Sequence, residues 1–356
     1  MKHITKRFDE NIYTSNVLDF YFSSMKIGVL DIETTGLNPS RNKLILGGLF
    51  DLQDGIMHQF FAENRSEEKQ ALEEFYELLS GFDMVITYNG KHFDMPFIAR
   101  RMKAHGIGPD ADHSIDAAAL LPYDLDLYLV INGHSPIKKF VPNLKQKTIE
   151  NYMGLWQSRD DEISGAESVE LYNKYEKTGD AELESKILLH NSDDVLQLTR
   201  LIKVLSKCDI HRAMYHLGFP IKIDDAGSGI GLLIVDKIKT EKSSLFISGR
   251  QLPHRSGSTS YSEFSGIDYM GFSYGEWPAE SRFESRNMSF SMQLPVLRES
   301  GLCIIDLDAA GLDRKSFEKY PSSGNGFLVL EDHNNRNFME TNHFVKSFLE
   351  VFMANI

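Results

Sequence analysis

One short segment constrains the fold of this 356-residue chain more than any other. Residues 26–37, KIGVLDIETTGL, begin as an apolar run and continue through two acids, Asp31 and Glu33, to a glycine turn. The apolar run predicts a buried β-strand. Side chains two apart on a strand point to the same side of the sheet, so this strand holds two carboxylates close together. Such a pair repels unless a cation lies between, and a divalent metal ion is the usual one.

The segments that follow predict two more strands and then alternating helices and strands. NKLILGGLFD and GIMHQFFA are strand-like runs joined by a tight turn at residues 53–55. A capped amphipathic helix is expected to start near Ser66, and a strand at DMVITYNG. A helix is then expected at HFDMPFIARRMKAHG, ending at Gly106. Three strands followed by helix, strand and helix is similar to the opening of the ribonuclease-H fold.

The rest of the chain predicts one long helix and then a change of character. Apolar residues recur at helical spacing over residues 182–207, whereas the sequence beyond 208 offers short strands, stretches rich in Ser and Gly, and a final helix at NHFVKSFLEVFM. We therefore expect an α/β fold in two domains. Residues 1–207 would form a mixed sheet flanked by helices, and residues 208–356 a smaller β-rich α+β domain whose role the sequence does not indicate.

Three motifs resemble those of a known nuclease superfamily. DIETTGL is similar to the first motif of the DEDD 3′–5′ exonucleases, Asp-x-Glu-x-Thr-Gly-Leu. NGKHFD, with Asn89 and Asp94, and HNSDDV, with His190 and Asp194, are similar to the second and third motifs. The likeness covers about residues 25–205 and is greatest to the YprB-like branch, which has a ribonuclease-H-like domain. An ordinary strand end with solvated acids is the alternative for a bare Asp-x-Glu, but the ordered set of three motifs favours the nuclease.

The resemblance implies a metal-dependent nuclease, a phosphodiester hydrolase acting on DNA or RNA from a 3′ end. Four acids would hold two Mg²⁺ or Mn²⁺ ions, which clamp the attacking and leaving oxygens of the phosphodiester. These metal-binding acids are Asp31, Glu33, Asp94 and Asp194. The residues expected to contact substrate lie in the first two motifs: Thr34, Gly36, Leu37, Asn89 and Phe93.

His190 is the expected general base. It stands four residues before Asp194 on a helix, so both side chains lie on one face. The commoner family patterns have a His five residues, or a Tyr four residues, before the last Asp, and the four-residue His agrees with the YprB-like branch. The alternative is a histidine that only bonds nearby backbone. Asn191 and Asp126 are auxiliary candidates. Asp126 lies in YDLDLYLV, residues 123–130, which alternate like a strand, and Asp116 is a rival for its role. For both Asp126 and Asp116, a strand-end carboxylate without a catalytic role is the favoured alternative.

Charge argues against a protein that coats nucleic acid electrostatically, because the net charge is −13. Residues 91–147 nevertheless contain eight Lys or Arg against six Asp or Glu. Within this stretch, residues 138–147 (KKFVPNLKQK) lack acids and are followed by Tyr152 and Trp156. Basic residues near aromatic ones suit single-stranded nucleic acid, and a solvated loop is the alternative.

No apolar run is long enough for a membrane-spanning helix, and the first residues lack the apolar core of a signal peptide. Cys208 and Cys303 form no metal-ligand spacing and are expected to be reduced, as in the cytoplasm. Two other classes of function compete with a nuclease. One is a non-catalytic module of the same fold that binds nucleic acid or protein, and the other is a structural or regulatory role centred on the second domain. The presence of all four acids and His190 favours the enzyme.

Overall fold

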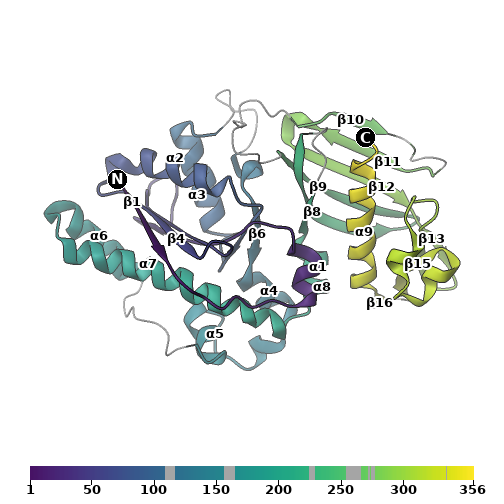
Figure 1. The fold of residues 1–356 in the computed structure, drawn as a ribbon, viewed down its shortest axis with the longest axis horizontal. Coiled ribbons are helices and arrows are strands. Elements are labelled where there is room, and N and C mark those ends of the chain that lie inside the picture. Colours follow the sequence, from purple (N-terminus) through teal and green to yellow (C-terminus); the bar gives the residue numbers. More distant parts are fainter. Residues whose placement is uncertain are drawn as a thin grey trace. The chain divides into compact units, whose positions relative to one another are not determined.

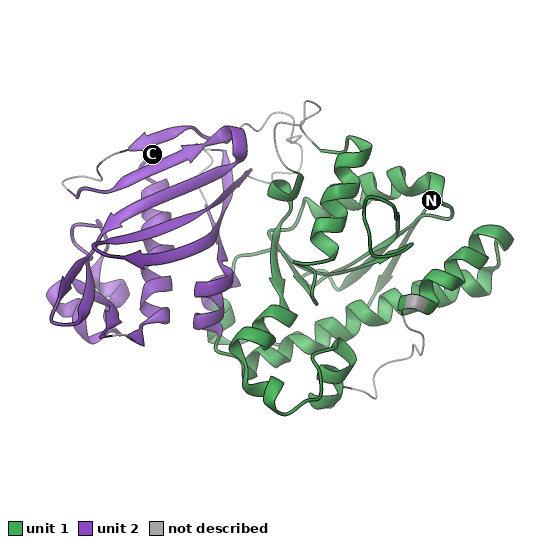
Figure 2. Cartoon of the chain, turned by 180° about the vertical axis from the view of Figure 1, so that it is seen from behind, with its two compact units in different colours: residues 1–19, 23–209 green, residues 20–22, 210–356 purple. Residues whose placement is uncertain are grey.

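The computed structural model describes residues 1–108, 117–155, 165–223, 229–253, 266–271, 273, 277–333 and 335–356. These form two compact units, shown in green and purple in Figure 2. The first unit comprises Met1–Asp19 and Ser23–Asp209, and the second comprises Phe20–Phe22 and Ile210–Ile356. None of the described helices has the length and apolarity needed to cross a bilayer.

The first unit is built on a six-stranded mixed sheet with the order β1-β4-β3-β2-β5-β6 (Figure 1). β2 is antiparallel to β3 and parallel to β5, and β5 is parallel to β6. The carboxyl ends of β2, β5 and β6 therefore lie at one edge of the sheet. The strands are β1 (Lys2–Arg7), β2 (Ile27–Thr34), β3 (Leu44–Asp51), β4 (Ile56–Phe61), β5 (Met84–Thr87) and β6 (Tyr123–Asp126).

Helices cover both faces of this sheet, with α2 packed against β3 and β4 on one face and α7 on the other. Adjacent glycines of β3 allow both approaches. A Cβ on Gly47 would lie 2.7 Å from the Phe75 ring of α2, and one on Gly48 would lie 2.1 Å from the Asn191 amide oxygen of α7. The helices are α1 (Asn16–Phe22), α2 (Glu68–Leu79), α3 (Asp94–His105), α4 (Leu127–His134), α5 (Gln146–Tyr152), α6 (Gly165–Thr178) and α7 (Ala181–Leu201), which continues as a 3₁₀ helix over Ile202–Lys207.

The predicted fold class is confirmed, and the order β2, β3, β4, α2, β5, α3 is the one that the sequence patterns predicted. Two features differ from the prediction. Strand β1 precedes the meander and pairs with β4. The strand expected at YDLDLYLV ends at Asp126, because the Asp126 carboxylate accepts hydrogen bonds from the amides of Tyr128 and Leu129 and so caps α4.

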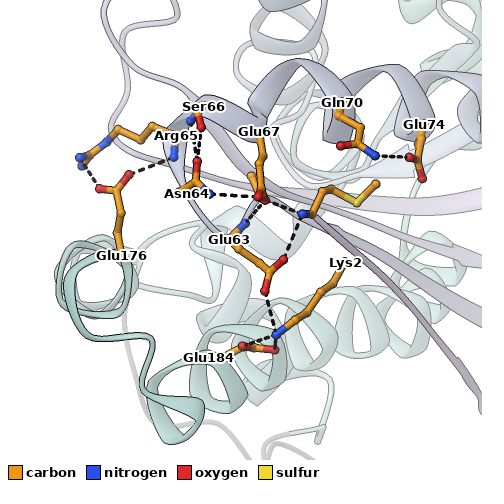
Figure 3. A network of polar contacts seen from close by, with 12 residues as sticks. Lys2, Glu63, Asn64, Arg65, Ser66, Glu67, Gln70, Glu74, Glu176 and Glu184 are labelled. Atoms are coloured by element: carbon orange, nitrogen blue, oxygen red, sulfur yellow. Dashed lines mark hydrogen bonds and ion pairs between the residues drawn. The ribbon is translucent and has the colours of Figure 1, made fainter.

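A polar network ties the α6–α7 hairpin to the far edge of the sheet (Figure 3). The Lys2 ammonium lies 2.7 Å from the Glu184 carboxylate of α7 and 3.1 Å from Glu63. The Arg65 guanidinium lies 2.5 Å from the Glu176 carboxylate of α6. Beneath these surface pairs, the buried Tyr172 hydroxyl donates to the Ala62 carbonyl at 3.0 Å. Helix α7, which carries the third motif, and helix α6, which precedes it, are therefore held by both ion pairs and buried contacts.

The second unit contains two antiparallel sheets, as the β-rich prediction required. The sheet orders are β10-β11-β12-β9-β8-β7 and β13-β14-β15-β16. The core of this unit is aromatic: Phe348 and Phe352 of α9 pack with Trp277 and Phe283. The elements are α8 (Ile210–Leu217), β7 (Phe219–Lys222), β8 (Ile230–Glu241), β9 (Ser244–Pro253), β10 (Tyr269–Gly271), β11 (Glu280–Glu284), β12 (Ser289–Pro295), β13 (Leu297–Glu299), β14 (Leu302–Asp306), β15 (Phe327–Asp332), β16 (Asn335–Arg336) and α9 (Phe338–Met353).

The end of α1 belongs to this second unit. Tyr21 is 1% exposed, and its hydroxyl lies 2.8 Å from His211 Nδ1 and 2.8 Å from the Asn342 amide nitrogen. The Lys346 ammonium donates a hydrogen bond to the Phe20 carbonyl at 2.6 Å and lies 5.1 Å from the centre of the Phe20 ring. No sequence pattern had indicated this long-range packing.

Candidate metal centre

The four predicted acids come from three elements that converge at the carboxyl ends of the parallel strands. Asp31 and Glu33 lie on β2, Asp94 is the first residue of α3, and Asp194 lies on α7. The Asp94 carboxylate accepts a hydrogen bond from the Ile32 amide at 3.2 Å, which fixes it against β2. The negative charges of Asp94, Asp194 and Glu33 all act on Asp31. The structure therefore places these residues in one cluster.

His190 lies inside the cluster, between two of the acids. Its Nε2 atom is 3.5 Å from a Glu33 carboxylate oxygen and 3.6 Å from an Asp194 carboxylate oxygen. Ligand atoms of these three residues lie within 4.8 Å of one another, a spacing that suits a single metal ion. Glu33 and His190 are buried, whereas Asp31 and Asp194 are partly exposed. The cluster therefore reaches solvent through Asp31 and Asp194.

Burial and mutual repulsion disfavour the ionised carboxylates. Burial raises the pKa of Glu33 to about 7, with Asp194 and Asp94 adding to the rise while His190 and the Ser168 hydroxyl oppose it. Burial likewise raises the pKa of Asp94 to about 7. The pKa of Asp31 is raised well above its ordinary value by burial and then by the charges of its three acidic neighbours. Without a bound cation, simultaneous ionisation of these carboxylates is therefore disfavoured.

Asn191 of helix α7 fixes the position of Asp31 on strand β2. Across the sheet Asp31 pairs with Gly48, and Gly48 pairs with Gln59. The fully buried Asn191 lies over Gly48, where any other side chain would clash with it. Its amide nitrogen donates to the Asp31 carboxylate at 3.2 Å, and its amide oxygen accepts from Gln59 Nε2 at 3.0 Å. The auxiliary residue Asn191 is thus a positioning group for Asp31.

The turn after β2 carries the residues of the first motif that were expected to contact substrate. The Thr34 hydroxyl donates to the Gly36 carbonyl at 2.9 Å and so closes the turn. Gly36 has a φ of +150°, a conformation that side chains disfavour. Leu37 follows with its side chain 82% exposed, which is unusual for a large apolar residue. Its contact with substrate stays a prediction.

The second motif is held in place by Asp126. Asn89 adopts a positive φ of 64°, and its amide donates to one Asp126 oxygen at 2.8 Å. The Lys91 amide donates to the other oxygen at 3.2 Å. Asp126 therefore supports the loop before Asp94 while it caps α4. Phe93 precedes Asp94 and packs against Phe97, with ring centres 5.7 Å apart.

The sequence motifs did not point to two further polar residues near the cluster. The buried Ser168 of α6 donates to the second Glu33 oxygen at 3.1 Å. Asp124 of β6 is buried, accepts a hydrogen bond from the Thr87 hydroxyl at 2.7 Å and leaves its other oxygen without a described partner. Burial raises the pKa of Asp124 to about 8. A serine far from any motif gives no sequence signal. Asp116 lies outside the described residues.

The donor set fits a divalent cation. Four carboxylates offer the hard oxygen ligands that Mg²⁺ and Mn²⁺ prefer, and His190 adds one nitrogen. Among the described residues, no lysine or arginine forms an ion pair with Asp31, Glu33 or Asp94. Three buried or half-buried acids without such a partner are expensive to ionise unless a cation is bound.

The chain is similar to proteins of known and unknown function. An uncharacterised protein of Methanocaldococcus jannaschii is 27% identical over 190 residues, which cover 52% of this chain and 98% of that protein. A DNA polymerase of the same organism is 32% identical over 76 residues, covering 20% of this chain and 5% of the polymerase. A solved family B DNA polymerase of Pyrobaculum calidifontis has a TM-score of 0.38 at 20% identity, covering 51% of this chain and 24% of the polymerase. The chain thus spans only a small part of either polymerase.

The family is shown by a match that covers half of the chain. Residues 29–206 match the family model described as the RNase_H superfamily. The matched range begins inside β2 and ends in the 3₁₀ helix after α7. It therefore contains all four acids and His190. As the three motifs predicted, the chain belongs to the RNase_H superfamily.

Proposed function

We propose that this protein is a divalent-metal-dependent nuclease that hydrolyses phosphodiester bonds of DNA or RNA. The observation that carries the proposal is the convergence of four acids and one histidine at the carboxyl ends of parallel strands, in a chain of the RNase_H superfamily. The three motifs further favour an exonuclease that removes nucleotides from a 3′ end.

Each residue of the cluster has a distinct role in this proposal. Asp31, Glu33, Asp94 and Asp194 would hold two Mg²⁺ or Mn²⁺ ions. When bound, the ions supply positive charge at the scissile phosphate and make the attacking water more acidic. Asn191 holds Asp31, and Ser168 holds Glu33, so that neither carboxylate must reorient.

His190 is proposed to take a proton from the attacking water. Its Nε2 atom faces the space between the Glu33 and Asp194 carboxylates, where the reacting groups would gather. It is buried, so bulk water does not compete for the proton. The same geometry would also suit a metal ligand, and the two roles differ in their effect on metal affinity.

The decisive experiment compares hydrolysis by the wild-type chain and by Asp31→Asn. Labelled single-stranded DNA and RNA oligonucleotides are incubated with Mg²⁺, with Mn²⁺ and with a chelator, and the products are separated by length. We expect a ladder shortened from the 3′ end by the wild type with either metal, and loss of activity by orders of magnitude in the variant. Equal hydrolysis by both proteins would place any activity elsewhere, and no hydrolysis by either would support a non-catalytic binding role.

A further inference from the structure

A lysine-rich segment, residues 138–152, is hydrogen-bonded to the backbone of Asp194 in the acidic cluster. The Tyr88 hydroxyl, next to Asn89 of the second motif, donates to the Leu144 carbonyl at 2.6 Å. The side-chain amide of Gln146, the first residue of α5, donates to the Asp194 carbonyl at 3.2 Å. α5 also packs against α7. Residues 138–152 therefore border two of the three motifs.

This segment exposes two aromatic side chains. Phe140 is 68% exposed and Tyr152 is 45% exposed. Large apolar side chains are usually buried, and in this unit most phenylalanines are. Exposed rings on a lysine-rich segment suit a surface that stacks with nucleic-acid bases.

The charges on the segment are unusual for this unit. Lys138, Lys139, Lys145 and Lys147 are all exposed, and no acid occurs between residues 135 and 149. Several cations elsewhere in the unit are paired, as in Lys26 with Asp51 and Arg200 with Glu10. In contrast, Lys139 and Lys145 form no ion pair with any residue that the structure describes. The ammonium groups of Lys139 and Lys145 are therefore available to bind an anion from outside the chain.

We propose that residues 138–152 form the docking surface that leads a single-stranded nucleic acid into the acidic cluster. The lysines would meet the phosphates, and Phe140 and Tyr152 would stack with the bases. The proposal rests on the function proposed above and adds where the strand lies beyond the scissile bond. A single strand is favoured because stacking on exposed rings requires unpaired bases. Trp156, which the sequence grouped with this segment, lies outside the described residues.

Charge complementarity explains why such a surface is needed here. The chain carries a net charge of −13, and the cluster itself holds four carboxylates. Both repel a polyanion at long range. Lys139 and Lys145, which form no ion pair with any described residue, would offset this repulsion where the strand enters. A protein partner with an acidic surface is the competing occupant, and the experiment separates the two.

The test measures binding without hydrolysis. The full chain carries Asp31→Asn to block hydrolysis, Ca²⁺ replaces Mg²⁺, and a fluorescein-labelled 12-nucleotide single strand is titrated by anisotropy over a range of salt concentrations. We expect Lys139→Glu with Lys145→Glu to weaken binding about tenfold or more. We also expect them to flatten the slope of log K against log salt by roughly 1.4, since each lost phosphate contact on a single strand removes about 0.7. The control pair, Lys177→Glu with Lys203→Glu, has the same net charge and should change both values little.

The aromatic half of the proposal has its own variant. Phe140→Ala should weaken single-strand binding about tenfold while leaving the salt slope unchanged, because stacking releases no counterions. Leu297→Ala is the control, because Leu297 is an apolar residue of the second unit that is also largely exposed.

Unchanged affinity and slope in the lysine variants would overturn the proposal, as would equal loss in the control pair, which would reveal a general charge effect. Binding is measured without turnover, so its failure is read separately from any failure of the hydrolysis experiment.

Discussion

The Asn191 amide donates hydrogen bonds to both the backbone carbonyl and the carboxylate of Asp31, each at 3.2 Å, across 160 residues of sequence. The same side chain accepts a hydrogen bond from Gln59, so its orientation is fixed on both sides. Helix α7 therefore does more than supply His190 and Asp194. It also locks the first acid in the rotamer that faces them.

Gly48→Ala should break this lock. Its new Cβ would lie 2.1 Å from the Asn191 oxygen, so Asn191 or the helix must move. We expect a loss of about 1–3 kcal/mol in the free energy of unfolding, the usual effect of overpacking a core, and a fall in hydrolysis. Gly133→Ala in α4 is the matched control, since nothing lies within 4 Å of the added methyl. Denaturant unfolding of both variants checks this, and equal stability of the two would contradict it.

Asp31→Asn should stabilise the metal-free protein near neutral pH. The folded-state pKa of Asp31 is raised, so the folded protein holds this proton more tightly than the unfolded chain. The stability that the proton provides is present below about pH 4 and is lost as pH rises toward the raised pKa. Removing the ionisable group should therefore raise the melting temperature increasingly with pH. Thermal melts in a chelator at several pH values test this, with exposed Asp54→Asn as the control. A stabilisation that vanishes at high pH would contradict the assigned direction.

Metal binding should strengthen as pH rises through about 7. Burial raises the pKa of Glu33 and Asp94 to about 7, so protons compete with the cation below that value. We expect the apparent Mg²⁺ affinity to climb from pH 5.5 to 8 and then level. Binding near pH 6.5 should also release protons. Calorimetry in buffers of different ionisation enthalpy measures both quantities, and a flat affinity over this range would show that the carboxylates bind the cation without losing protons.

His190→Ala distinguishes a base from a ligand. If His190 is the general base, its removal should slow single-turnover hydrolysis roughly 10²–10⁴-fold, while the Mg²⁺ affinity changes little. If His190 is instead a metal ligand, the variant should bind Mg²⁺ more weakly, because a ligand atom of His190 lies within 4.8 Å of ligand atoms of Glu33 and Asp194. Both quantities are measured on the same protein. Unchanged hydrolysis would make His190 a structural residue.

Ser168→Ala tests the hydrogen bond that fixes Glu33. We expect Mg²⁺ affinity to fall about tenfold, as is usual when a group that orients a ligand is removed. If the serine acts only through Glu33, then Ser168→Ala should have little further effect in a Glu33→Gln background. Additive losses in the double variant would mean that Ser168 supports the helix and not the carboxylate.

The ordered motifs allowed the superfamily and the order of the first strands and helices to be read from the sequence. They also singled out four acids that the structure brings into one cluster. Local patterns carry this information, because an apolar run ending in Asp-x-Glu fixes its own geometry. The partners of these residues could not be read in the same way. Ser168 lies 135 residues from Glu33, and Gln59 lies 132 residues from Asn191. Such pairings depend on how helices pack across the sheet. Asp126 was ambiguous for the same reason, because it also accepts hydrogen bonds from the amides of Asn89 and Lys91 in the loop that follows β5.

The packing of Phe20–Phe22 into the second unit has a consequence for how the chain folds during synthesis. Phe20 leaves the ribosome well before its partner Lys346, which lies 326 residues later. At about 5–20 residues per second, synthesis takes roughly 16–65 s to supply that partner. During this interval the core that packs against the aromatic triplet is incomplete. The triplet would therefore be accessible to a chaperone that binds apolar segments. A fragment that comprises only residues 210–356 would lack the triplet, so the second unit on its own would have a cavity in its core.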